Sequence, residues 1–387
     1  MKILRSGRNR RKWIYVLLLM GLLGLSGCGS PSSASVEMSS QTELVKTGSM
    51  ELQYAENFAV DYYEDGYKML TTLPDSKRYL LVPEGQPVPR GLDEDVSILQ
   101  EPLQNIYLVA SGVMDMFVSV DAVDQIRFSG QKQENWYIQT AKDAMAAGNM
   151  IYAGKYSKPD YELLVSEGCD LAIENRMITH SPEVVEMLQS FDIPVMIEYS
   201  SYEQHPLGKV EWVKFFGALT GREAEAEEAF AEQTEILEEV ESGEKTGKTI
   251  AFFYVTSNGL IQVRQSTDYI PKLIELAGGR YIFEDLEDSG SGRSTLNMQV
   301  EDFYAGAKNA DILIYNSSID GGVTTLDELI GKCNILKDFK ALQEGQVYCT
   351  TNDMYQQSMA IGYLLQDMHT VLTDDDTAKL RYLFLLQ

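Results

Sequence analysis

Residues 222–241 read Arg-Glu-Ala-Glu-Ala-Glu-Glu-Ala-Phe-Ala-Glu-Gln-Thr-Glu-Ile-Leu-Glu-Glu-Val-Glu, with no glycine or proline in the run. Most of these residues are strong helix formers. The apolar positions form one stripe at helical period, opposite an acidic face: Ala226, Ala229, Phe230, Ile236, Leu237 and Val240. Such a helix is about 30 Å long. Because strand-like and helix-like segments alternate on both sides of it, we predict a rigid helix joining two α/β lobes. Periodicity alone leaves open an ordinary surface helix within one domain.

The amino terminus has the pattern of a secretory signal. Six basic residues precede an apolar run at residues 13–25, and small residues lead to Cys28. A basic region, a short apolar region and a small-residue site are typical of a cleaved signal, here residues 1–27. The sequence Leu-Ser-Gly-Cys resembles the lipobox of bacterial lipoproteins, which implies cleavage before Cys28 and its lipidation. A plain signal peptide with a chance cysteine is the alternative. We expect residues 28–50, rich in serine and threonine, to form a disordered tether.

The composition excludes several partners. The chain has 58 acidic and 32 basic residues and a formal net charge of −26, and removal of the six basic residues of the signal would make it −32. A surface this acidic does not favour nucleic acid or anionic lipid. We therefore expect a protein anchored by acyl chains on the extracytoplasmic face of the cell membrane. The other cysteines, Cys169, Cys333 and Cys349, have neither redox nor zinc spacing and are interpreted as buried small side chains.

Residues 51–221 are predicted to form the N-terminal lobe. They begin with short strands at 51–54, 58–62 and 78–82, followed by a loop at 83–91. From residue 106 strands and helices alternate, which favours parallel βαβ units. The strands are expected at 106–110, 126–128, 170–174 and 193–197, and the helices at 113–117, 143–148, 161–165 and 182–190. Ligands bind beyond the carboxyl ends of such strands. The loops expected there are 110–113, 129–137, 174–179 and 198–205.

Residues 222–244 are assigned to the linking helix and residues 245–387 to a C-terminal lobe. The same alternation continues there, and we expect fewer strands than in the first lobe. The strands are predicted at 249–255, 261–264, 310–315 and 345–349, and the helices at 269–276, 299–307 and 357–372.

Several segments, taken in order, carry a family likeness. They are Pro-Asp-Tyr-Glu-Leu-Leu at 159–164 with Gly-Cys-Asp-Leu-Ala-Ile at 168–173, Leu-Thr-Gly-Arg-Glu at 219–223, Leu-Ala-Gly-Gly at 276–279, Ala-Asp-Ile-Leu-Ile at 310–314 and Glu-Gly-Gln-Val-Tyr at 344–348. From residue 106 to residue 372 the chain resembles the periplasmic-binding-protein-2 family, the solute-binding lipoproteins of ABC importers for iron–siderophores, haem and cobalamin. The resemblance implies two lobes that hold a ligand in the cleft between them and dock on a permease dimer with its ATPase. Residues 51–100 are not placed by it.

Candidate ligand-binding residues fall on the predicted strand-end loops. Aromatic faces with one or two guanidinium groups suit a large, flat, anionic ligand such as a ferric siderophore or haem. The alternative for any one aromatic is an ordinary surface position. The candidates are Ser111, Trp136, Tyr137, Arg176, Tyr199, Tyr202, Arg264, Asn316 and Tyr355.

The sequence gives no reason to expect a metal site or catalysis. Its three histidines, His180, His205 and His369, are too dispersed for a bare-metal site. We favour capping or structural roles for them, and the alternative is that one of the two loop histidines approaches the cleft. Met114 and Met116 could touch haem, although core packing is the better interpretation. There is no phosphate-binding loop and no nucleophile elbow. We therefore predict no catalytic residues, no metal ligands and no cofactor, although the ligand itself could carry iron or cobalt.

The resemblance also implies one permease-docking acid in each lobe. By position these are Glu162 and Glu301, each near the start of a helix, where the helix dipole alone would also favour an acid. The sequence thus predicts a monomeric solute-binding lipoprotein of an ABC importer for an iron–siderophore, haem or corrinoid. A bare-metal receptor is one alternative. An extracytoplasmic enzyme or an adhesive surface lipoprotein on the same scaffold is another.

Overall fold

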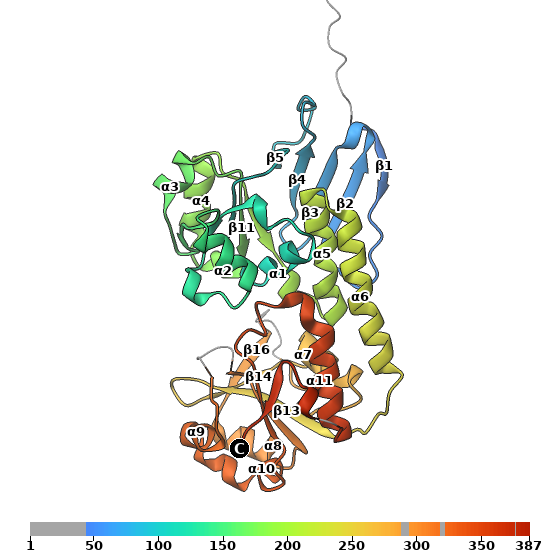
Figure 1. The fold of residues 1–387 in the computed structure, drawn as a ribbon, viewed down its shortest axis with the longest axis vertical. Coiled ribbons are helices and arrows are strands. Elements are labelled where there is room, and N and C mark those ends of the chain that lie inside the picture. The colour runs from blue at the N-terminus through green and yellow to red at the C-terminus, as the bar shows by residue number, and fades with distance from the viewer. Residues whose placement is uncertain (1–43, 288–293, 318–321, 376) are drawn as a thin grey trace, which may run out of the picture. The chain divides into compact units, whose positions relative to one another are not determined.

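A helix between two α/β lobes organises the computed structural model, as predicted (Figure 1). The structure describes residues 44–287, 294–317, 322–375 and 377–387. The expected signal peptide, Cys28 and the tether as far as residue 43 lie outside these residues. Among the described residues, none of the helices is both long and apolar enough to cross a membrane.

The linking helix is α6 (Glu223–Glu241). Its buried stripe includes Ala226, Phe230, Leu237 and Val240. Gln233 lies in this stripe, and its Oε1 accepts the backbone N–H of Gly362 in the C-terminal part of the chain at 3.0 Å. The helix therefore packs against both parts of the molecule that it connects.

A second long helix, α5 (Pro206–Thr220), precedes α6 and was not predicted. Every residue of α5 except its last is buried, so it has no polar face. A helix that is buried on all sides has no solvent-facing polar stripe, so its sequence shows no amphipathic period. Gly221, which follows it, has a φ of 70° and ends the helix in the left-handed conformation.

An N-terminal sheet precedes the two lobes. It consists of β1 (Lys46–Ser49), β2 (Phe58–Tyr63), β3 (Lys68–Thr72), β4 (Lys77–Val82) and β5 (Val96–Gln100), in that order. The strand expected at 51–54 is absent, and β1 lies in the segment expected to be a tether. The lysine and small residues of β1 carry no strand pattern, and β1 forms by pairing antiparallel with β2.

The N-terminal sheet is fastened to α5. Phe58 of β2 packs edge-on against Trp212 and Phe215 of α5, with ring centroids 4.9 and 5.3 Å apart. Two buried carboxylates, Glu203 and Glu211, accept backbone N–H groups from residues 53–57. Residues 53–57 therefore lie beside α5. Their backbone N–H groups donate to these carboxylates and not to the carbonyl groups of a neighbouring strand.

The N-lobe has a five-stranded parallel sheet in the order β12-β11-β6-β7-β8. Its strands are β6 (Ile106–Leu108), β7 (Ile126–Ser129), β8 (Ile151–Tyr152), β11 (Leu171–Asn175) and β12 (Val195–Glu198). Its helices are α1 (Val113–Ser119), α2 (Gln139–Ala146), α3 (Tyr161–Ser166) and α4 (Pro182–Ser190). A small ribbon of β9 (Gly154–Lys155) and β10 (Lys158–Pro159) lies between β8 and α3 in the chain. The predicted alternation and parallel pairing are confirmed.

The C-lobe has a mixed sheet in the order β16-β14-β13-β17-β18-β19, with β15 paired to β13. Its strands are β13 (Thr249–Val255), β14 (Ile261–Arg264), β15 (Arg280–Tyr281), β16 (Thr295–Met298), β17 (Ile312–Tyr315), β18 (Val347–Thr350) and β19 (Leu383–Leu385). Its helices are α7 (Tyr269–Leu276), α8 (Val300–Ala307), α9 (Leu326–Lys332), α10 (Lys340–Gln343) and α11 (Ile361–Thr373). Among the described residues the C-lobe has strands β13–β19 and residues 51–221 have strands β2–β12, so the expectation of fewer strands in the C-lobe is confirmed.

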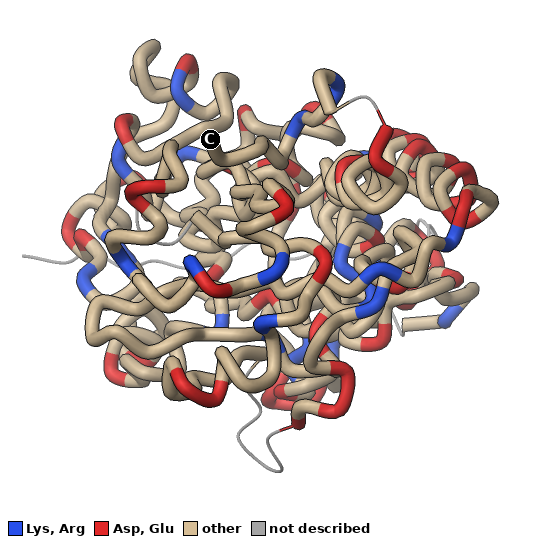
Figure 2. The backbone as a smooth tube through the Cα atoms, turned by 90° about the horizontal axis from the view of Figure 1, so that it is seen from below, with Lys and Arg blue, Asp and Glu red and all other residues tan. Residues whose placement is uncertain are grey.

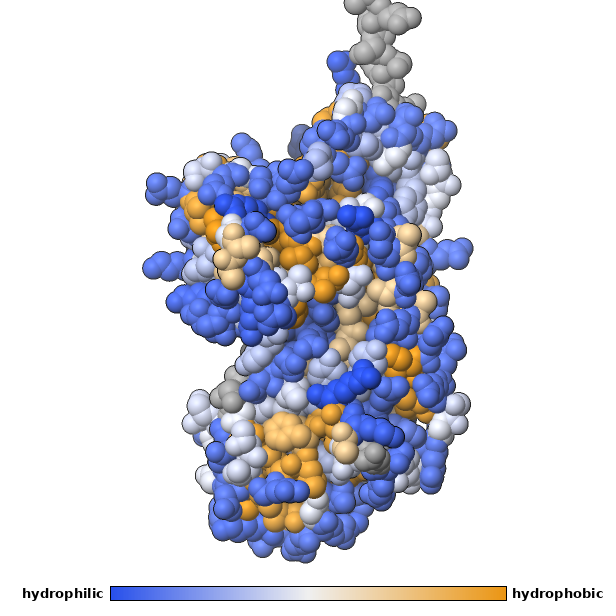
Figure 3. Space-filling model, in the orientation of Figure 1, coloured by the Kyte–Doolittle hydropathy of each residue, from blue (hydrophilic) through white to orange (hydrophobic). Residues whose placement is uncertain are grey.

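The surface agrees with the acidic composition. Figure 2 shows acidic positions spread over the whole described backbone rather than gathered on one face. The face drawn in Figure 3 is mostly hydrophilic and is hollowed between the N-lobe and the C-lobe.

Candidate functional site

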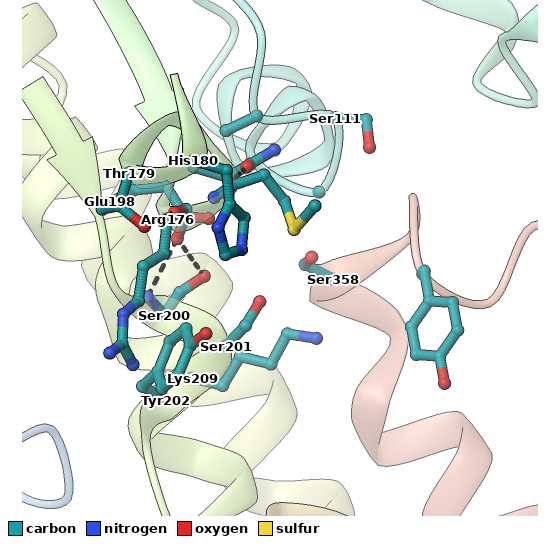
Figure 4. A pocket seen from close by; sticks show the side chains of 15 residues that line it. Ser111, Arg176, Thr179, His180, Glu198, Ser200, Ser201, Tyr202, Lys209 and Ser358 are labelled. Atoms are coloured by element: carbon teal, nitrogen blue, oxygen red, sulfur yellow. Dashed lines mark hydrogen bonds between the residues drawn. The ribbon is translucent and has the colours of Figure 1, made fainter. Parts of the chain in front are cut away.

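A cavity of about 470 Å³ lies where the N-lobe meets the C-lobe. The N-lobe contributes the segments that follow three neighbouring parallel strands, β6, β11 and β12, and α5 contributes Lys209 (Figure 4). The C-lobe contributes Tyr355 and Ser358. The lining residues are Ala110, Ser111, Gly112, Asn175, Arg176, Met177, Thr179, His180, Glu198, Ser200, Ser201, Tyr202, Lys209, Tyr355 and Ser358. Three of the four N-lobe loops that the sequence predicted at the ligand side thus meet at one cavity.

Four predicted ligand residues line the cavity: Ser111, Arg176, Tyr202 and Tyr355. The guanidinium of Arg176 lies over the ring of Tyr202, 4.6 Å from its centroid. This stacking fixes a positive group at the cavity wall and covers one face of the tyrosine.

Three other predicted residues do not line the cavity. Trp136 is 1% exposed, and its Nε1 donates to Ser129 Oγ at 3.1 Å, so its ring belongs to the N-lobe core. Tyr199 is buried behind Tyr202. Tyr137 is 48% exposed, and its backbone N–H donates to Gln356. The loop at 129–137 folds back on Ser129, which gives the indole N–H a partner inside the core.

Arg264 and Asn316 lie behind Tyr355 rather than in the cavity wall. The Arg264 guanidinium donates to the Tyr355 hydroxyl, and Asn316 Nδ2 donates to the same oxygen at 2.7 Å. Arg264 is 8% exposed and also pairs with Asp268 at 3.3 Å. Burial raises the pKa of Tyr355. The two residues therefore hold the Tyr355 side chain, which is the part of this group that reaches the cavity.

Lys209 was missed by the sequence analysis. It is only 5% exposed, yet among the described residues its ammonium has no hydrogen-bond or ion-pair partner; it lies 4.7 Å from the centroid of the Tyr269 ring. Burial lowers the pKa of Lys209, which Glu198 partly offsets. A lysine inside the apolar run of α5 was the available signal, because such a charge is costly without a role.

Glu198 and four hydroxyl residues of the lining were also missed: Thr179, Ser200, Ser201 and Ser358. Glu198 Oε2 accepts the backbone N–H of Ser200 at 2.9 Å and its hydroxyl at 2.5 Å. Burial raises the pKa of Glu198, although these hydrogen bonds oppose the effect. Small hydroxyl residues give no pattern of their own in a sequence, so only the folded loops reveal that they face one space.

Two of the three histidines have structural roles, and the third lies at the cavity. His205 Nδ1 accepts the backbone N–H of Leu207 at 3.2 Å and caps α5, and His369 Nδ1 contacts the Ala277 carbonyl at 2.9 Å. His180 lines the cavity. Met114 and Met116 are in the core, as favoured. Among the described residues no group of three or more histidine, cysteine, aspartate or glutamate side chains could hold a metal ion.

Hydrogen bonds join the lobes beside the cavity. The Gln356 side chain accepts the backbone N–H of Tyr137 and donates to the Asn135 carbonyl, both at 2.8 Å. Asp115 of α1 accepts the backbone N–H of Met359 at 2.8 Å. A Cβ on Gly112 would lie 2.9 Å from Ser358 Oγ, so the lobes approach closely here.

The two expected docking acids are both exposed in the first turn of a helix. Glu162 lies in α3, which Asp160 caps by accepting the Leu163 N–H at 3.1 Å, and Glu301 lies in α8. Their positions fit the expectation and fit equally well with stabilisation of the helix dipole.

No family model matches the chain. Two curated proteins of Methanocaldococcus jannaschii are similar to it. The uncharacterized lipoprotein MJ0878 is 23% identical over 93% of this chain and 92% of its own length. The uncharacterized lipoprotein MJ0872 is 23% identical over 89% of this chain and 90% of its own length.

Solved structures of periplasmic binding proteins share the fold. A possible iron-binding solute-binding protein of Staphylococcus epidermidis is 18% identical with a TM-score of 0.53, covering 69% of this chain and 97% of that one. The haem-binding protein HutB of Vibrio cholerae is 15% identical with a TM-score of 0.55, covering 69% and 98%. The petrobactin-binding protein YclQ of Bacillus subtilis is 12% identical with a TM-score of 0.55, covering 70% and 92%. The chain therefore has the two-lobed fold of the type-2 periplasmic binding proteins.

Proposed function

We propose that this protein is the extracytoplasmic solute-binding lipoprotein of an ABC importer and that it captures a metal chelate between its lobes. The chelate would be an iron–siderophore, haem or a corrinoid, delivered to a permease dimer with its ATPase. The observation that carries the proposal is the cavity of about 470 Å³ at the carboxyl ends of β6, β11 and β12, closed on its other side by the C-lobe. Parallel sheets bind ligands at this edge, and cavities of this size suit small molecules.

The residues have different roles in this proposal. Ser111, Arg176, Tyr202 and Tyr355 contact the ligand, and Arg264 and Asn316 hold Tyr355 in place. Tyr199 supports the ring of Tyr202, with centroids 6.4 Å apart. Because Trp136 is in the N-lobe core and Tyr137 is outside the cavity, neither is proposed as a ligand contact.

The bare-metal receptor is disfavoured by the side chains present. A naked divalent ion needs several converging nitrogen, sulfur or carboxylate ligands. Among the residues that line the cavity, only His180, Glu198 and the thioether of Met177 are of this kind. An enzyme or an adhesive lipoprotein on this scaffold remains the alternative from another class, since a fold does not fix a function.

The test is the cargo and its uptake. Protein purified without denaturation would be examined by native mass spectrometry for a retained metal chelate. Uptake of that chelate would then be measured in cells lacking the gene. A retained chelate whose uptake requires the protein supports the proposal. Normal uptake in the deletion strain contradicts the importer role.

A further inference from the structure

Lys209 is a cation without a counter-ion among the described residues, in a site built by both lobes. It is nine-tenths buried, and in Figure 4 its side chain extends into the open space that the hydroxyls of Ser201 and Ser358 also face. Among the described residues no carboxylate forms an ion pair with it. A buried ammonium group is costly unless something pairs with it, so its position points to an anionic group on the ligand.

A second buried lysine on the same helix, Lys214, does have carboxylate partners. Lys214 is buried to a similar degree, and its Nζ lies 3.0 Å from Glu227 and 3.5 Å from Glu211. Within the part of the chain that the structure describes, two carboxylates lie within ion-pair distance of Lys214 and none within ion-pair distance of Lys209. The difference is that Lys209 is the one at the cavity.

The rest of the cavity wall is rich in hydroxyl groups and has few aromatic rings. Seven of its side chains carry hydroxyls: Ser111, Thr179, Ser200, Ser201, Tyr202, Tyr355 and Ser358. The only aromatic rings among them are those of Tyr202 and Tyr355, and Arg176 already covers one face of Tyr202. Hydroxyl and ammonium groups donate hydrogen bonds to oxygen anions. Apart from Tyr202, Tyr355 and His180, the lining side chains offer a flat macrocycle no ring on which to stack.

We infer that the cavity takes a compact ligand through carboxylate oxygens, with the Lys209 ammonium as its anion-binding group and the hydroxyls of Ser201 and Ser358 beside it. This rests on the proposed function and narrows its ligand class from siderophore, haem or corrinoid to a compact carboxylate ligand without a macrocycle. The carboxylates could belong to a metal chelate or to the free acid, and the two sources are separable by experiment.

The test is calorimetric titration of the wild type, Lys209→Met and Lys214→Met with citrate, ferric citrate and haemin. Lys209→Met keeps length and removes charge. We expect ferric citrate to bind the wild type and Lys209→Met to bind it about ten- to a hundredfold more weakly, the range for losing a hydrogen bond to a charged group. Lys209→Met should melt no lower than the wild type, because it removes an unpaired buried charge. Lys214→Met should show the opposite pattern, with unchanged affinity and a lower melting temperature.

Each outcome is decisive. If citrate and ferric citrate bind equally well, the carboxylate-binding role of Lys209 is supported. The same result counts against a metal chelate as the ligand in the proposed function. Equal affinity of Lys209→Met and the wild type overturns the inference. Binding of haemin alone overturns it too, while leaving the importer role intact. Failure of all three probes to bind also overturns it.

Discussion

The buried carboxylate of Glu211, on α5, accepts the backbone N–H of Ala55 at 2.8 Å, across 156 positions of sequence. The same carboxylate accepts the N–H groups of Gln53 and Tyr54 at 2.8–3.1 Å. One side chain therefore satisfies three main-chain donors that no strand pairs.

We expect Glu211→Gln to lower the free energy of unfolding by about 3–5 kcal/mol, the range for breaking a buried charged pair. The amide keeps the shape but presents N–H groups to N–H groups, and it removes a partner of Lys214. Urea denaturation at pH 7 measures the loss. The matched control is Glu227→Gln, since Glu227 contacts the same lysine from an exposed position and should cost about 0–1 kcal/mol. A similar small loss in both variants would show that the N–H cluster does not depend on Glu211.

A pH-dependent contribution to stability is expected from Glu174. This residue of β11 is fully buried, neither carboxyl oxygen has a hydrogen-bond partner among the described residues, and burial raises its pKa to about 8 from 4.5. The folded state therefore holds the proton more tightly than the unfolded state. The contribution of this proton to the free energy of unfolding is fully present below about pH 4.5 and is lost as the pH rises through 8.

The measurement is the unfolding free energy of wild type and Glu174→Gln at pH 6 and pH 9. The wild type should lose on the order of 2–3 kcal/mol more than the variant between these values, because the neutral amide has no proton to lose. Glu186→Gln, an exposed acid of the same lobe, is the control and should follow the wild type. Parallel pH curves for wild type and Glu174→Gln would refute the assignment.

Permease docking is predicted to depend on Glu162 and Glu301. The free energy of unfolding of the double variant Glu162→Arg, Glu301→Arg should stay within about 1 kcal/mol of the wild-type value, since both acids are exposed and act at most on helix dipoles. It should retain ligand affinity and abolish uptake in cells lacking the wild-type gene. The variant Glu235→Arg, Glu239→Arg makes the same charge change on the exposed side of α6 and should transport normally. Normal uptake by the first variant would rule out docking through these acids.

Lipid anchoring is predicted to depend on Cys28, which precedes the described residues. Cys28→Ala should abolish membrane retention and leave the protein in the medium or unprocessed. Fractionation of cells and an immunoblot for size test this, with Cys169→Ala as a control that changes a cysteine of the N-lobe. If the Cys28→Ala protein stays on the membrane at the mature size, the anchor lies elsewhere.

Much of the fold could be predicted because its elements have readable periods. The linking helix α6 has one polar face, and strands such as β13 are continuous apolar runs between helices, so their order gave the alternation of lobes. The helix α5 could not be found this way because it is buried on all sides. Strand β1 could not be found either, since its residues are exposed and only pairing with β2 forms it.

The sequence predicted which loops form the candidate site, but it did not predict which side chains of these loops line the cavity. Parallel strands bring their carboxyl ends together, which correctly indicated the segments holding Ser111, Arg176 and Tyr202. Aromatic residues were given too much weight, because Trp136 finds its hydrogen-bond partner in the core. The position of Lys209 depends on where α5 crosses beneath these loops, which is a tertiary fact that no local pattern contains.

The packing of the N-terminal sheet on α5 has a consequence for the order in which the chain folds. Phe58 finds its aromatic partners, Trp212 and Phe215, about 150 residues later in the chain. Domains usually fold from the amino terminus as the chain emerges, but this sheet cannot complete its core until α5 is present. Contacts this distant in sequence also form slowly. We therefore expect the N-terminal sheet to pack late, after α5 has been made.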